Sequence, residues 1–158
     1  MTEGDRRRAL AESIVQTLDA MFFTSCLGEP EARVAPRFEL AAQVAFDGRP
    51  PGRLTLRVDQ AAARSIAAGF LGEEEDAISE RQVSDVVCEM ANVICGAALS
   101  RIEGAEEFRL GAPRMVEPAA ADARRGGVAH AVETGRGVLE AALEMEELVC
   151  PPAEKSAS

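Results

Sequence analysis

The chain has 158 residues, 47% of them hydrophobic, which is enough for one domain with a core but short for two. Its 27 acidic and 17 basic residues give a net charge of −10 at pH 7, which argues against nucleic acids and anionic membranes as partners. We find no apolar run near the roughly 18 residues that span a membrane, and no signal peptide, so we expect a cytoplasmic protein.

Residues 5–25 are predicted to form the first helix, because apolar side chains recur there at helical spacing. The apolar face of this helix consists of Leu10, Ile14, Leu18, Met21 and Phe22. Residues 26–35 follow as a loop that contains Gly28 and Pro30.

An antiparallel hairpin is predicted next. Residues 38–46 and 53–58 alternate apolar and polar side chains, as half-buried strands do, and residues 47–52 (DGRPPG) are typical of a turn. The two prolines of this turn remove backbone N–H donors and no helix begins directly after it. Its glycines are therefore not interpreted as a phosphate-binding loop.

A short helix follows the hairpin. Asp59 is a favourable N-cap for a helix that runs through Leu71, and Gly72 is a favourable end. The acidic sequence GEEEDAIS, residues 72–79, predicts a solvated loop before the next helix.

The longest helix is predicted over residues 79–103, with Gly104 as its stop. Ser79 and Gln82 have the spacing of a capping box at its start. On a wheel of about 100° per residue, the apolar face comprises Val83, Val87, Met90, Ala91, Ile94, Ala97 and Ala98. The opposite side carries a stripe made of Asp85, Glu89, Asn92 and Gly96.

The stripe contains residues that weaken a helix. The amide of Asn92 competes for backbone hydrogen bonds, and Gly96 costs roughly 1 kcal/mol relative to alanine. A missing side chain one turn after Asn92 would let a partner approach the helix backbone. Glu-x-x-Asn alone is a weak motif, so a second interpretation stays open. In it, the stripe is an ordinary solvated helix face and Gly96 serves helix packing.

The last third of the chain is predicted to form mainly extended segments. Residues 108–117 look like a strand interrupted at Pro113, and residues 118–125 look like a loop. Residues 127–133 and 137–146 predict a second hairpin around residues 134–136. The buried face of its last strand carries Leu139, Ala141, Leu143 and Met145.

The order of helix, two strands, two helices and about three strands predicts an α+β domain, with helices packed on one face of a mainly antiparallel sheet. We expect residues 1–149 to form a single domain and residues 150–158 to be a disordered tail.

The cysteines and the single histidine give no sign of a metal site or a catalytic triad. The four cysteines are Cys26, Cys88, Cys95 and Cys150, and no pair has CxxC spacing. Cys88 and Cys95 lie near the edge of the apolar face of the long helix and are expected to be reduced, small packing residues. His130 is expected to be a packing or edge residue of a strand. We therefore assign no metal ligand and no cofactor-binding residue to this chain.

Several motifs occur here in a characteristic order. They are the turn at residues 48–52 before a strand ending in Asp59, the helix end Phe70-Leu71-Gly72, the pair Glu89-x-x-Asn92 and the small-residue run Gly96-Ala97-Ala98. Together they resemble the CheC/CheX/FliY family of chemotaxis phosphatases, and CheX most closely. The resemblance runs from about Val44 to Glu117, and more weakly to Met145. It implies the same α+β fold and a homodimer paired through the sheets, which the sequence pattern alone does not show.

The resemblance also implies a reaction. Family members remove the phosphoryl group from the phospho-aspartate of the response regulator CheY, which carries its own Mg²⁺. By this resemblance Glu89 and Asn92 are the catalytic residues: Asn92 would orient a water for in-line attack and Glu89 would pair with a lysine of the regulator. Asp85 and Gly96 would shape the docking surface. In-line phosphoryl transfer depends mostly on positioning, and an amide both donates and accepts hydrogen bonds.

Two functions remain open at this point. CheC-like members carry two Glu-x-x-Asn helices, whereas the first helix here, at residues 19–22, lacks the pair. The first hypothesis is a CheX-like aspartyl-phosphate phosphatase. The second is a non-catalytic module that binds a receiver domain or a flagellar switch component through the same helix. The third and least favoured hypothesis is a free-standing metalloenzyme or nucleotide-binding enzyme.

Overall fold

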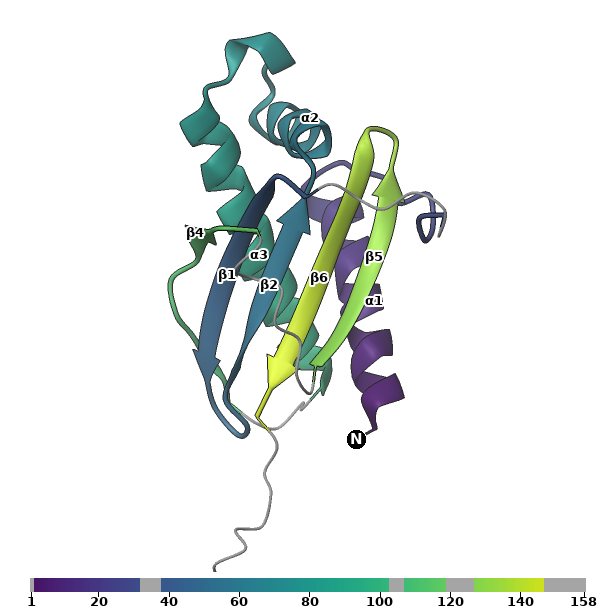
Figure 1. Ribbon diagram of the computed structural model, residues 1–158, viewed down its shortest axis with the longest axis vertical. Coiled ribbons are helices and arrows are strands. Elements are labelled where there is room, and N and C mark those ends of the chain that lie inside the picture. The colour runs from purple at the N-terminus through teal and green to yellow at the C-terminus, as the bar shows by residue number, and fades with distance from the viewer. Residues whose placement is uncertain (1, 32–37, 103–106, 119–126, 147–158) are drawn as a thin grey trace, which may run out of the picture.

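The computed structural model describes residues 2–31, 38–102, 107–118 and 127–146. Along the chain its elements are α1 (Glu3–Met21), β1 (Leu40–Asp47), β2 (Gly52–Val58), α2 (Gln60–Leu71), the 3-10 turn η1 (Glu75–Ala77), α3 (Glu80–Ile102), β3 (Arg109–Leu110), β4 (Arg114–Val116), β5 (Gly127–Thr134) and β6 (Gly137–Met145). Helices α1 and α3 lie against one face of an antiparallel sheet, and α2 lies near one end of it (Figure 1). This arrangement confirms the predicted α+β fold.

The described strands pair in the order β3-β1-β2-β6-β5, with β4 also pairing with β1, and every pair is antiparallel. In the central strand β2, Leu54 lies opposite Val44 of β1 and Leu143 of β6. All three side chains are buried. Because side chains alternate along a strand, the apolar positions of three adjacent strands form one surface that packs against the helices.

The other face of the sheet carries polar side chains that are paired with each other. Arg57 of β2 is only 8% exposed, donates to the Glu140 carboxylate of β6 with its Nε at 3.1 Å, and lies over the Phe38 ring at 5.0 Å. Gln43 of β1 donates to the hydroxyl of Thr55 at 3.0 Å. The alternation in β2 therefore separates an apolar face from a polar face, and on the polar face Thr55 and Arg57 are buried whereas Arg53 is exposed.

Helix α1 begins earlier and ends earlier than expected. Thr2 and Asp5 form a capping box at its start, and the helix ends at Met21. Met21 is 42% exposed, so its predicted place in the core is wrong, whereas Phe22 is fully buried and stacks on Phe70 of α2 at 4.8 Å. The backbone leaves the helix at Phe22, the C-cap residue, and reaches a positive φ at Phe23.

Helix α2 has the predicted caps. The Asp59 carboxylate accepts from the backbone N–H of Ala62 at 2.8 Å and from that of Val138 at 2.9 Å. Gly72 ends the helix in the left-handed conformation, with φ 69°. Asp59 therefore caps α2 and also joins it to strand β6.

We expect Asp59→Ala to lower the free energy of unfolding by about 1–2 kcal/mol, because it removes the N-cap and leaves the Val138 N–H without its acceptor. Urea unfolding measures the change. Glu73→Ala, which removes an exposed carboxylate just beyond the same helix, is the control. Equal stability of the two variants would contradict this role.

The remaining predictions are partly confirmed. The segment 108–117 is extended and interrupted at Pro113, between β3 and β4. The acidic segment 72–79 is not entirely a solvated loop, because it contains η1 and the buried side chain of Ile78. Gly104 and the tail 150–158 lie outside the described residues, and the domain boundary at residue 149 stays a prediction.

Candidate functional site

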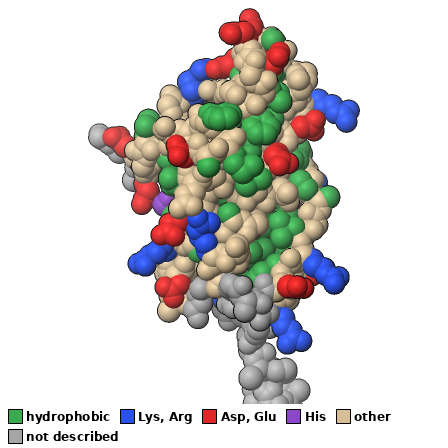
Figure 2. All heavy atoms as spheres, turned by 180° about the vertical axis from the view of Figure 1, so that it is seen from behind, with side chains coloured by type: hydrophobic (Ala, Val, Ile, Leu, Met, Phe, Trp, Pro, Cys, Tyr) green, Lys and Arg blue, Asp and Glu red, His purple; other side chains and the backbone are tan. Residues whose placement is uncertain are grey.

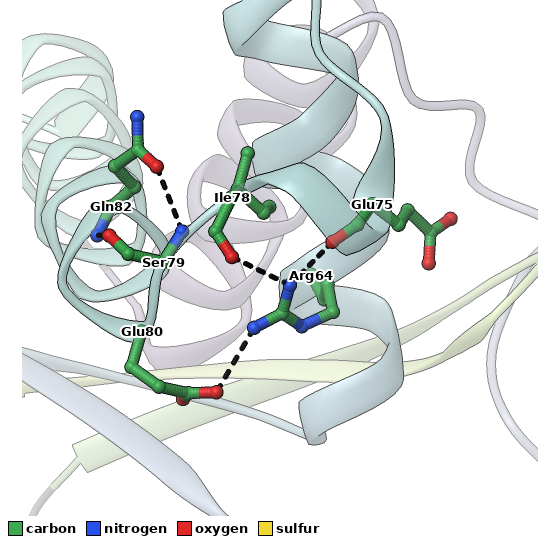
Figure 3. Close-up of polar contacts among 6 residues, drawn as sticks. All are labelled: Arg64, Glu75, Ile78, Ser79, Glu80 and Gln82. Carbon is green, nitrogen blue, oxygen red and sulfur yellow. Dashed lines mark hydrogen bonds and ion pairs between the residues drawn. The ribbon is translucent and has the colours of Figure 1, made fainter.

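Helix α3 begins with the predicted capping box. The backbone N–H of Ser79 donates to the Gln82 side-chain oxygen at 2.8 Å, and the backbone N–H of Gln82 donates to the Ser79 hydroxyl at 3.1 Å (Figure 3). These bonds satisfy backbone donors that the first turn of a helix would otherwise leave open. The start of α3 is therefore determined by its own sequence.

A second contact, from α2, holds the same region. The guanidinium of Arg64 donates to the backbone carbonyl oxygens of Glu75 and Ile78, the latter at 3.0 Å, and to the Glu80 carboxylate at 3.0 Å (Figure 3). Glu75 also pairs with Arg136 of the β5–β6 hairpin at 2.7 Å. These bonds tie the connection between the two helices to α2. Sequence reasoning missed this network, because the partners of Arg64 lie 11 to 16 residues away in the chain.

The inward side of α3 is wider than predicted. Its buried residues are Val83, Val86, Val87, Met90, Ala91, Ile94, Cys95, Ala98, Leu99 and Ile102. Ala97 is only half-buried, so its predicted place in the core is wrong. The helix packs against α1, α2, β1 and β2, and neighbours on several sides bury more than one narrow stripe.

The outward side carries the predicted stripe. Asp85 and Glu89 are exposed, and Asn92 and Gly96 are half-buried. Within the part of the chain that the structure describes, the side chains of Asp85, Glu89 and Asn92 have no hydrogen-bond or ion-pair partner. A Cβ added at Gly96 would meet only the Leu110 side chain, at an ordinary contact distance of 3.9 Å. Close packing within the described chain therefore does not explain this glycine.

An open groove with a volume of about 270 Å³ lies beside the stripe. It is lined by Phe70 and Leu71 of α2 and by Gln82, Asp85, Val86 and Glu89 of α3. The side chains of Phe70 and Leu71 are 36% and 38% exposed. Figure 2 shows hydrophobic side chains gathered on the upper part of this helix-covered face, with acidic side chains beside them. In the sequence, Phe70-Leu71-Gly72 is recognisable only as a helix end, and no local pattern there indicates the groove.

The thiols on α3 are packing residues. Burial raises the pKa of Cys95 to about 12, and burial together with the negative charge of Asp85 raises the pKa of Cys88. A thiol with a raised pKa is a poor nucleophile at neutral pH. Among the residues that the structure describes, no group of three or more His, Cys, Asp or Glu side chains is placed to hold a metal ion. His130 is half-buried in the edge strand β5.

By length and hydropathy alone, α3 is able to span a membrane, contrary to the expectation that no segment approaches that limit. Half of its most apolar stretch is buried inside the structure, against the sheet and α1. The core helix of a soluble protein has the same property, so the apolar character of α3 is explained by internal packing.

The fold corresponds to that of the chemotaxis phosphatase class that the sequence resembles. The model of the family "Chemotaxis phosphatase CheX" matches residues 40–133, which include the whole of α3. This chain therefore belongs to the CheX family of chemotaxis phosphatases. A comparison with curated protein sequences gives no match.

Solved structures share the fold at low identity. CheX from Vibrio vulnificus has a TM-score of 0.71 and 18% identity, over 92% of this chain and 99% of that one. A CheC-like superfamily protein from Shewanella sp. PV-4 has a TM-score of 0.74 and 18% identity, over 92% and 100%. A CheX–CheY–BeF3–Mg²⁺ complex from Borrelia burgdorferi matches with a TM-score of 0.72 and 16% identity, over 90% and 99%.

Proposed function

We propose that this protein hydrolyses the phospho-aspartate of a CheY-type response regulator. The observation that carries the proposal is the pair Glu89 and Asn92, which lie one turn apart on the outward side of α3 without partners in the described chain. Membership of the CheX family supports the phosphatase class. The complex of a similar CheX with CheY, BeF3 and Mg²⁺ supports the choice of partner.

In this reaction a water oxygen attacks phosphorus as the bond from phosphorus to the aspartate oxygen breaks. The products are inorganic phosphate and the free aspartate carboxylate. Asn92 would accept a hydrogen bond from the water through its carbonyl oxygen and so orient it for in-line attack. The amide is not a base, so its contribution is positioning.

Glu89 would contact a lysine of the regulator. A carboxylate and an ammonium group form a charge-assisted pair, and this pair would set the register of α3 on the regulator. The regulator would supply Mg²⁺, which neutralises charge on the phosphoryl oxygens. Asp85 and Gly96 would belong to the docking surface, where Gly96 allows close approach to the helix backbone.

Two further proposals concern the setting of this reaction. We propose that the protein acts in the cytoplasm, together with its regulator, and that it forms a homodimer paired through the sheets. The first repeats the expectation drawn from the sequence, and the second comes from the family resemblance. Sedimentation of the purified protein tests the second.

The test of the proposed function is the lifetime of the phosphoryl group on a purified CheY-type receiver in the presence of Mg²⁺. We expect substoichiometric amounts of this protein to shorten the lifetime with turnover, and EDTA to abolish the effect. A protein that binds the receiver but leaves the lifetime unchanged would contradict the phosphatase proposal and favour the non-catalytic docking module.

A further inference from the structure

We propose that the groove beside Glu89 is a second anchor for the receiver, and that it takes an apolar side chain next to a lysine or arginine. This inference rests on the proposed function and extends it from the catalytic pair to the specificity of docking. The groove and the stripe share Asp85 and Glu89, so a partner seated on one contacts the other.

The size of the groove limits its occupant. A volume of about 270 Å³ lies below the roughly 300–1,000 Å³ of typical small-molecule sites. The groove is also open to solvent, and the side chains of Asp85 and Glu89 that line it are exposed. These properties fit one or two side chains of a docked protein better than an enclosed cofactor.

The chemistry of the lining determines which side chains fit. Phe70, Leu71 and Val86 provide an apolar floor, and the carboxylates of Asp85 and Glu89 provide an acidic rim. Neither carboxylate has a cation partner in the described chain. An apolar side chain with a basic neighbour matches both parts, because it removes apolar surface from water and places a positive charge beside the rim.

The same charges argue against a second copy of this chain as the occupant. The net charge of the protein is −10, and an acidic groove attracts basic surfaces rather than another acidic molecule. A receiver that presents a lysine to Glu89 would bring the required charge to the lining of the groove.

The walls of the groove are held in place before any partner arrives. Phe70 stacks on the buried ring of Phe22, and Gln82 is engaged in the capping box of α3. Arg64 links the end of the α2–α3 connection to α2. A pre-formed surface loses little conformational entropy on binding, as an anchor for a transient partner requires.

The experiment measures the affinity of the protein for a receiver loaded with BeF3 and Mg²⁺, and separately the dephosphorylation rate at saturating protein. We expect Leu71→Ala to weaken binding about five- to tenfold and to leave the saturated rate unchanged. Asp85→Asn is expected to weaken binding about threefold at low salt, with the difference disappearing at high salt.

Two variants serve as controls. Val15→Ala removes a side chain that is 41% exposed on α1, outside the groove, and is expected to bind like the native protein. Leu71→Met keeps the apolar volume and is expected to retain most of the affinity. Circular dichroism confirms that each variant is folded.

Unchanged affinity in Leu71→Ala, or equal losses in Leu71→Ala and Val15→Ala, would overturn the groove proposal. A native protein that binds no receiver would overturn it as well. Because binding is measured without turnover, a native protein that binds through the groove but does not shorten the phosphoryl lifetime contradicts only the proposed phosphatase function.

Discussion

Asn92→Ala is expected to slow receiver dephosphorylation at saturating protein by about 100-fold or more, since it removes the group proposed to orient the attacking water. The fold should survive the change. The Asn92 amide has no partner in the described chain, so its loss leaves no buried group without a hydrogen bond. Alanine is also the better helix former, by about 0.5 kcal/mol, so the melting temperature should be equal or slightly higher.

The measurement is single-turnover loss of phosphoryl from the receiver, together with the affinity for the BeF3-loaded form. Ser100→Ala, which changes an exposed polar residue further along α3, is the matched control and should retain the native rate. Asn92→Ala should still bind the receiver, because Glu89 and the groove remain. If this variant keeps more than about half of the native rate, another group must position the water.

Met90→Ala is expected to lower the free energy of unfolding by about 3 kcal/mol. Met90 is fully buried on the inward side of α3, next in sequence to Glu89. Truncation removes buried apolar atoms and leaves a cavity, which typically costs about 2–5 kcal/mol. That is a large part of the roughly 5–15 kcal/mol that stabilises a domain.

Urea unfolding of native protein, Met90→Ala and Met90→Leu tests this expectation. Met90→Leu nearly conserves volume and should cost less than about 1.5 kcal/mol. It should also keep the native dephosphorylation rate, because Met90 supports the helix without contacting the receiver. A Met90→Ala variant within about 0.5 kcal/mol of the native protein would show that this face of α3 is not packed as described.

These two variants address opposite sides of one helix. The inward side of α3 is held by α1, α2 and the sheet, and the outward side presents Asp85, Glu89 and Asn92. A site on a packed helix keeps its side chains at fixed relative positions, which a reaction that depends on orienting one water requires. Substitution of Met90 should therefore change the free energy of unfolding, whereas substitution of Asn92, only two residues away, should change the dephosphorylation rate.

Features that depend on neighbours in the chain were predictable from the sequence. The Ser79–Gln82 capping box, the Asp59 cap and the Gly72 helix end are each made by residues within a few positions of each other. The alternation in β2 and β6 and the outward position of Glu89 on α3 follow from the periods of strand and helix. The roles of Glu89 and Asn92 came from family resemblance and stay proposals.

Features that depend on distant segments were decided only by the tertiary structure. Three features join residues with no local relationship in sequence: the α2–α3 groove, the bonds from Arg64 to the connection that follows α2, and the part-buried ion pair of Arg57 with Glu140. Met21 was misplaced for the same reason. Helical spacing put it on the apolar face, but the helix ends there and Phe22 takes the buried position against α2. Local hydrogen bonding and periodicity set the elements, whereas packing between elements sets which side chains meet.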